Sequence, residues 1–538
     1  MTWLAPVVLA ALVMLPRLAS PQFGFLDDGL TLEIGRRVIG RWSDLLHLNP
    51  ETGRFVPAYW LVYSAIVAAV GVRPWAFFTV NVVILAALLA MLARLVRRSG
   101  GTRGQAGVTM VVFAACGPTI ESVYTLSKPE PLQLLWMAGA LATAAASEAA
   151  SARRVGSIAL AAVLSLLAYA TKETSLVLIP IALGWLAIDW AGGRSRRFPA
   201  TYVAVNAMAA AAFLALRAHY APLALAEGSY TRAYTLEWRV IAPALFRIAA
   251  WLVRDFAFLL PLLVVLAVWR PGGPGRSGRL VRYAAVWMAG WLAVFLPWPA
   301  TFEYYLLPFA FGAAALAGLL VGDGWAARRR PGSASGRWLA WSALATAGLL
   351  WVMAAVNAVA DAKVQLTVDR ANAALVDFLG GLPVGSHVVL NTAMNEYHLE
   401  LPRHLVEITH RADITVEPPG RLAAADGRAP ADAFVITAEL ANRPSPTVRL
   451  ALDEAGVARD HALLGRLLAA PAAPVYRDVR HTRLVEIGIH RWLCRIAGPP
   501  WVDPTFCPAD RPVVDRRVFS YGWQVHRLMG PDGQRSRR

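Results

Sequence analysis

Apolar stretches separated by short polar loops dominate the chain up to about residue 360. A helix needs about 20 mostly apolar residues to cross a bilayer, and the first such run lies at 2–19. Further runs lie at 75–93, 106–124, 129–147, 156–171, 174–190, 199–216, 255–269, 283–298, 304–321 and 337–357. The pattern predicts a mainly α-helical, polytopic membrane bundle with about eleven crossings.

Three other segments are expected to lie at the membrane surface. Residues 57–71 are apolar but barely long enough to cross, which favours a re-entrant or interfacial helix. The segment 21–54 is polar and aromatic, which favours short surface helices. The segment 239–254 favours an interfacial amphipathic helix because three arginines recur at roughly helical spacing. They are Arg239, Arg247 and Arg254.

The composition changes near Asp361, where the chain becomes more charged. Short β-like runs follow at 387–390, 413–416 and 434–437. Helical patterns at 369–379 and 459–469 alternate with them. We therefore predict two domains: a membrane domain at 1–360 and a soluble α/β domain at 361–538.

The charge distribution gives an orientation. The chain is 57% hydrophobic and 16% charged, with a formal net charge of +17. It is too apolar for a soluble nucleic-acid-binding protein, and its basic residues cluster in loops between the apolar runs. Five basic loops fall on one side if 57–71 does not cross; they contain Arg94–Arg103, Arg153–Arg154, Arg194–Arg197, Arg270–Arg282 and Arg328–Arg337. The positive-inside rule makes that side the cytoplasm. We predict a multi-pass cell-membrane protein with a cytoplasmic N-terminus and an extracytoplasmic C-terminal domain.

The opposite side then receives a small set of charged and tyrosine side chains from separate loops. Ionisable groups next to membrane spans are costly and often mark function. The set comprises Asp27, Asp28, Lys128, Glu130, Lys172, Glu173, Glu303, Tyr304 and Tyr305. Each has a simpler alternative. Asp27-Asp28 is also typical of a turn or helix cap. Lys128-Pro129-Glu130 suits a plain helix start, Lys172-Glu173 suits solvated neighbours, and the tyrosines suit interfacial aromatics.

The convergence of acids and lysines on one face favours one kind of chemistry. A carboxylate acts as general base on an acceptor hydroxyl. A lysine binds a phosphate and offsets the charge on a leaving phosphate oxygen. A cleft at the membrane surface suits a lipid-linked phosphosugar, whose tail remains in the bilayer. The set therefore indicates glycosyl transfer from a lipid-phosphate carrier.

Five motifs in the first 320 residues resemble the GT-C membrane glycosyltransferases, near the protein O-mannosyltransferase and aminoarabinose-transferase branch (glycosyltransferase family 39-like). The motifs are Leu26-Asp27-Asp28-Gly29, the segment 53–60 (Gly-Arg-Phe-Val-Pro-Ala-Tyr-Trp), Ser127-Lys128-Pro129-Glu130-Pro131-Leu132, Ala170-Thr171-Lys172-Glu173 and the segment 303–308 (Glu-Tyr-Tyr-Leu-Leu-Pro). Family members often have Asp-Glu where this chain has Asp27-Asp28, and the second-loop acid usually lacks a preceding Lys-Pro.

The resemblance implies a polyprenyl-phosphate monosaccharide donor and attack with inversion. It implies that Asp27 is the base, that Asp28 is its neighbour, and that Lys172 contacts the donor phosphate. Glu130 takes the place of the second-loop acid. Lys128 and Arg54 are further candidates for the phosphate, while Glu173, Glu303, Tyr304 and Tyr305 are expected to support the site.

The predicted function is thus an integral membrane glycosyltransferase acting on an envelope glycan, lipid or protein acceptor. A transporter or flippase of lipid-linked sugars would use the same charges as a headgroup path, although no paired repeats are visible. A polymerase or ligase acting on lipid diphosphates is a third possibility. No cofactor, metal site or nucleic-acid partner is predicted, although paired acids leave a divalent metal open.

The chain has three cysteines. Cys116 lies in an apolar run and is expected to be a small core residue. Cys494 and Cys507 lie near the C-terminus, where an extracytoplasmic location would allow them to pair.

Overall fold

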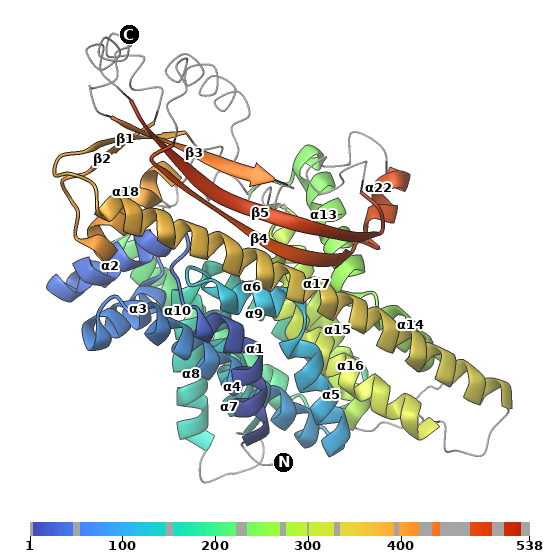
Figure 1. Ribbon diagram of the computed structural model, residues 1–538. Helices are drawn as coiled ribbons and strands as arrows, with labels where there is room; N and C mark the ends of the chain where they lie inside the picture. The colour runs from blue at the N-terminus through green and yellow to red at the C-terminus, as the bar shows by residue number, and fades with distance from the viewer. Residues whose placement is uncertain are drawn as a thin grey trace, which may run out of the picture.

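A layer of helices, a long crossing helix and a small sheet are stacked in that order in the computed structural model of the chain (Figure 1). The structure describes residues 4–46, 54–146, 154–221, 234–268, 276–298, 301–327, 334–391, 397–418, 433–441, 474–497 and 511–528. The helical layer holds the larger hydrophobic core. A second core lies between the long helix and the sheet.

Five described helices are long and apolar enough to cross a membrane, or six if one bent pair is a single span. The five are α4 (Pro74–Arg98), η2 with α9 (Glu173–Ala191), α10 (Arg197–Tyr220), η3 with α16 (Glu303–Trp325) and the segment Gly336–Gly380 of α17. The prediction of a polytopic helix bundle is confirmed. The count of about eleven crossings stays a prediction.

The predicted span at 106–124 is bent. It forms α5 (Arg103–Ala114) and α6 (Gly117–Tyr124), which meet at 58°. Pro118 in the first turn of α6 explains the break, because proline disfavours helical conformation in the residue before it and lacks an amide donor. Gly117 permits a close approach: a Cβ there would lie 1.7 Å from Oε1 of Glu303.

The remaining described helices of the first 300 residues, apart from α5 and α6, lie around these five. They are α1 (Leu4–Ala19), α2 (Asp28–Gly40), η1 (Trp42–Leu46), α3 (Pro57–Val70), α7 (Glu130–Ala146), α8 (Arg154–Thr171), α13 (Trp238–Phe256), α14 (Leu259–Val268) and α15 (Arg276–Phe295). The helices expected within 21–54 and at 57–71 are therefore present. Whether they lie in the membrane surface stays a prediction.

Two of the three arginines of α13 do not lie on an exposed face, as an interfacial helix would require. Arg239 is exposed, but Arg247 and Arg254 are buried inside the protein. The helical spacing was correct, and the direction of the charged face was wrong because acidic partners for Arg254 lie within the bundle.

The helix α17 (Ala334–Gly380) joins the membrane bundle to the sheet (Figure 1). It merges the predicted span at 337–357 with the predicted helix at 369–379. The composition change near Asp361 therefore falls inside one helix, because a helix satisfies its backbone hydrogen bonds in lipid and in water alike. The division into domains at 360 stays a prediction.

The C-terminal sheet has the strand order β2-β1-β3-β5-β4. The strands are β1 (His387–Asn391), β2 (Thr415–Glu417), β3 (Phe434–Ala441), β4 (Tyr476–Ile487) and β5 (Val514–Arg527), with helices α18 (Tyr397–Thr409) and α22 (Arg491–Ala497). β1 pairs in parallel with β2 and β3, and β5 pairs antiparallel with β3 and β4. The predicted α/β tail is confirmed.

The two long strands β4 and β5 were not predicted. Alternate residues of β5 face the core against α17, and this two-residue period was a usable signal. They are Phe519, Tyr521, Trp523 and Val525.

The helical pattern at 459–469 lies outside the described residues. Cys494 in α22 is disulfide-bonded, and Cys507 also lies outside the described residues. Cys116 is a buried free cysteine, as expected.

Candidate active site

The loop between α1 and α2 carries Asp27 at the surface of the protein. Asp27 has a left-handed backbone (φ 59°), which aspartate tolerates better than most residues. It occupies the N-cap position of α2, yet its side chain makes no capping hydrogen bond. Its side chain is exposed. Asp27 therefore does not cap the helix through its side chain, whereas its left-handed backbone is consistent with the turn alternative.

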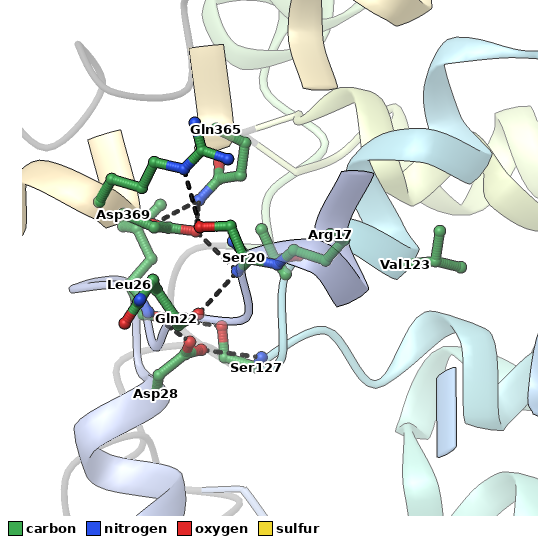
Figure 2. Close-up of polar contacts among 12 residues, drawn as sticks. Arg17, Ser20, Gln22, Leu26, Asp28, Val123, Ser127, Gln365 and Asp369 are labelled. Carbon is green, nitrogen blue, oxygen red and sulfur yellow. Dashed lines mark hydrogen bonds and ion pairs between the residues drawn. The ribbon is translucent and has the colours of Figure 1, made fainter. Parts of the chain in front are cut away.

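Asp28 has a different role from its neighbour. It is 2% exposed, and each of its carboxylate oxygens accepts a backbone hydrogen bond. The Gly24 amide donates to Oδ2 at 2.7 Å, and the Ser127 amide donates to Oδ1 at 3.1 Å. Figure 2 shows this link between the first and second loops. Burial raises the pKa of Asp28 to about 7. Asp28 thus joins the two loops and leaves Asp27 as the exposed carboxylate of the pair.

Lys172 and Glu130 form a buried ion pair. Lys172 lies between α8 and η2, and its ammonium contacts Oε1 of Glu130 at the start of α7. The same ammonium lies 4.2 Å from the centre of the Tyr305 ring. Burial lowers the pKa of Lys172 to about 8. The second oxygen of Glu130 is buried and has no protein hydrogen-bond partner.

Lys128 and the two tyrosines connect this pair to the first loop. The Lys128 ammonium lies 4.2 Å from the centre of the Tyr304 ring, and Tyr304 contacts Tyr305 edge to face. Both tyrosines are buried inside the protein. A continuous strip therefore runs from Asp28 through Lys128, the tyrosines and Lys172 to Glu130.

Glu173 and Arg54 lie beside the strip. Glu173 pairs with Arg217 at 2.6 Å and accepts a hydrogen bond from the Phe55 amide at 3.5 Å. Burial is the main cause of the lowered pKa of Lys172. Glu130 raises this pKa, and the nearby positive charge of Arg54 lowers it further. Glu173 is thus not a free solvated acid, because its charge is matched by Arg217, a residue that the sequence did not single out.

Glu303 belongs to a second buried cluster. Arg254 lies 2.7 Å from Glu303 and 2.5 Å from Asp361, and 3.6 Å from its neighbour Asp255. Only Glu303 was among the predicted site residues. The sequence had placed Arg254 in an amphipathic helix, and no local signal indicated its acidic partners. Among the residues that the structure describes, no group of three or more His, Cys, Asp or Glu side chains is arranged to hold a metal ion.

A cavity of about 50 Å³ lies between the bundle and α17. This is room for only a few water molecules. It is lined by the first loop at Phe25 and Leu26, by α6, by Lys128 and Glu303, by α17 from Asp361 to Asn372, and by Tyr397. Neither Asp27 nor Lys172 lines it. The structure thus brings Lys128 and Glu303 to one cavity, whose lining does not include the Lys172–Glu130 pair.

A buried ion pair holds α17 over the first loop. Arg17 at the end of α1 lies 2.7 Å from Asp369 of α17, and both side chains are almost fully buried. Arg17 also donates to the carbonyl of Gln22 at 2.9 Å, and Gln365 donates to Asp369 (Figure 2). The sequence signal was a charged residue inside the first apolar run, but its partner lies 352 residues away.

The fold is similar to that of known membrane enzymes. No protein-family model matches the chain, and no curated protein matches its sequence. The crystal structure of ArnT from Cupriavidus metallidurans bound to undecaprenyl phosphate matches over 98% of this chain and 99% of that chain, with a TM-score of 0.56 and 14% identity. The apo ArnT structure matches over 83% of this chain and 93% of that chain, with a TM-score of 0.53 and 15% identity.

The apo Archaeoglobus fulgidus oligosaccharyltransferase matches over 77% of this chain and 64% of that chain, with a TM-score of 0.50 and 12% identity. Both enzymes have the GT-C fold. The resemblance suggested by the sequence motifs is therefore confirmed at the level of the fold, and the likeness to ArnT includes the C-terminal sheet.

Proposed function

We propose that the chain is an integral membrane glycosyltransferase that uses a polyprenyl-phosphate-linked sugar. The observation that carries the proposal is the exposed Asp27 carboxylate, free of any capping role, at the edge of a strip of buried lysines. The likeness to ArnT over nearly the whole chain supports it, because that crystal structure contains undecaprenyl phosphate. The acceptor is an envelope glycan, lipid or protein on the outer face of the cell membrane.

The proposed reaction is a single displacement. Asp27 removes the proton of the acceptor hydroxyl, and the oxygen attacks the anomeric carbon of the sugar. The bond between that carbon and the phosphate oxygen breaks, and its electron pair leaves with the polyprenyl phosphate. Lys172 and Lys128, with Arg54 nearby, offset the charge that develops on the phosphate. Attack from the face opposite the leaving group inverts the anomeric configuration.

The tyrosines and acids of the strip set the charge of the phosphate site. The ring faces of Tyr304 and Tyr305 lie against the ammonium groups of the two lysines and stabilise their positive charge by cation–π attraction. Glu130 forms its ion pair with Lys172, and Lys128 adds a second positive charge beside the Tyr304 ring. A phosphate bound between the lysines would therefore meet a net positive surface in a largely water-excluded place.

Donor binding is expected to weaken above pH 8. Lys172, with its pKa lowered to about 8, loses its proton as the pH rises through that value, and the neutral amine no longer attracts a phosphate. The KM for the donor is expected to rise about tenfold between pH 7 and pH 9. The Lys172→Arg variant keeps its charge at pH 9. Its donor KM, measured over the same range, should stay flat; a parallel rise would assign the titration to another group.

The experiment that tests the function is reconstitution in liposomes with a labelled polyprenyl-phosphate sugar. A glycosyltransferase releases free polyprenyl phosphate at a rate that depends on the acceptor. A transporter or flippase moves the intact donor between leaflets and releases none, and that result would replace the proposal.

A further inference from the structure

The helix α18 of the C-terminal region packs against α2, the helix that begins beside Asp27. The Gly29 amide donates to one carboxylate oxygen of Glu400 at 2.7 Å, and the Leu30 amide donates to the other at 3.2 Å. With Asp27 as N-cap, these are the second and third amides of the helix. An N-cap side chain normally accepts from these same amides.

Glu400 therefore accepts the hydrogen bonds that an N-cap aspartate usually accepts from its own helix. Asp27 has the residue type and the position of a cap, but its left-handed backbone and exposed side chain leave it out of that role. The capping carboxylate comes instead from a residue 371 positions along the chain. Burial and the nearby Asp27 carboxylate raise the pKa of Glu400 to about 8, while the bonds from Arg403 and the Gly29 amide oppose that shift.

The surroundings of Glu400 hold it in place. Arg403 donates to Glu400 at 2.9 Å and to Glu33 of α2 at 2.8 Å. The same arginine thus links the capping residue Glu400 to α2. Gly29 provides the necessary space, because a Cβ there would lie 2.8 Å from both Oε2 of Glu400 and Nδ1 of His404. Farther along the same two helices, Glu407 pairs with the half-exposed Arg36 at 2.8 Å.

We propose that Glu400 is a positioning residue of the active site: the C-terminal domain caps α2 and thereby keeps the Asp27 carboxylate free for the acceptor. This inference rests on the proposed function. Without Glu400, two amides at the start of α2 lack an acceptor, and the adjacent Asp27 carboxylate is the nearest substitute. Asp27 then becomes an ordinary cap and is lost as a base.

The test compares Glu400→Ala with Glu407→Ala in the full-length protein in nanodiscs. Hydrogen exchange of the Gly29 and Leu30 amides should quicken about tenfold in Glu400→Ala, because their acceptor is gone. Transfer kcat should fall at least about tenfold while the donor KM stays within about twofold, because the phosphate site is untouched. Glu407→Ala should match the wild type in both measurements, since its partner Arg36 is half exposed.

Glu400→Gln serves as the conservative variant and as the safeguard against misfolding. Its amide oxygen still accepts one of the two bonds, so its exchange rates and kcat should lie between those of the wild type and Glu400→Ala. Unchanged kcat in Glu400→Ala, or an equal loss in Glu407→Ala, would overturn the inference.

The Asp27→Asn variant, assayed in parallel, separates the two proposals. If Asp27→Asn is inactive and Glu400→Ala transfers normally, only the positioning role is wrong. If Asp27→Asn transfers normally, the proposed base is wrong and Glu400 has no base to position; the exchange rates would then report a purely structural cap.

Discussion

Asp27→Asn is expected to lower kcat for sugar transfer by about 10²- to 10⁴-fold, the usual contribution of a general base. Asparagine has nearly the same shape as aspartate and tolerates the left-handed backbone of position 27. It cannot accept the proton of the acceptor hydroxyl. The side chain is exposed and makes no capping bond, so the folded protein should lose little stability.

The measurement is transfer by purified protein in liposomes, with insertion and thermal unfolding checked for each variant. Asp44→Asn provides a matched control, because Asp44 lies in the same segment between α1 and α3, in the first turn of η1. It should transfer at the wild-type rate. If Asp27→Asn also does so while correctly inserted, Asp27 has no part in the chemistry.

Lys172→Met is expected to have the second large effect, and on two properties at once. It leaves the buried Glu130 carboxylate without its partner, which costs about 3–5 kcal/mol of stability. It also removes a positive charge from the proposed phosphate site. Both the unfolding temperature and the affinity for the donor should therefore fall, and calorimetry with donor-binding measurements would record them.

The double variant Lys172→Met/Glu130→Gln separates the two effects. It removes both charges, so most of the stability should return, because a neutral buried pair needs no compensation. Donor binding should stay weak if Lys172 contacts the phosphate. Recovery of transfer to the wild-type rate would mean that Lys172 only neutralises Glu130.

The sequence predicted the membrane elements well because their signal is local. Length and hydropathy located α4, α10 and the helix after Glu303 within a few residues. The bend before Pro118 is also a local effect, readable in retrospect from the proline. The sequence did not predict that α17 continues past Asp361. The change in charge there indicates a change in the surroundings of the helix, not the end of the helix.

The site was predictable only in part, because local patterns identify residues but not their partners from distant loops. The motifs selected Lys128, Lys172, Glu130, Tyr304 and Tyr305, and the structure joins these residues in one strip. Their catalytic roles stay predictions. The pairings themselves link loops far apart in the chain, which no local pattern encodes.

The contacts from the C-terminal region were missed entirely. Asp369 lies in a soluble-looking stretch, and nothing in it indicates a partner in the first apolar run. Glu400 resembles any surface acid of an amphipathic helix until α18 is placed on α2. Such long-range pairs depend on how segments far apart in the chain pack together, and one sequence carries no direct signal for that.

We propose above that Asp27 drives a single displacement at the sugar of a lipid-phosphate donor. The most direct test supplies the reconstituted protein with a donor of known anomeric configuration and determines the configuration of the product by NMR, together with the polyprenyl phosphate released. We expect an inverted product and an equal amount of released carrier phosphate. A product with retained configuration, or donor moved intact across the bilayer without release, would contradict it.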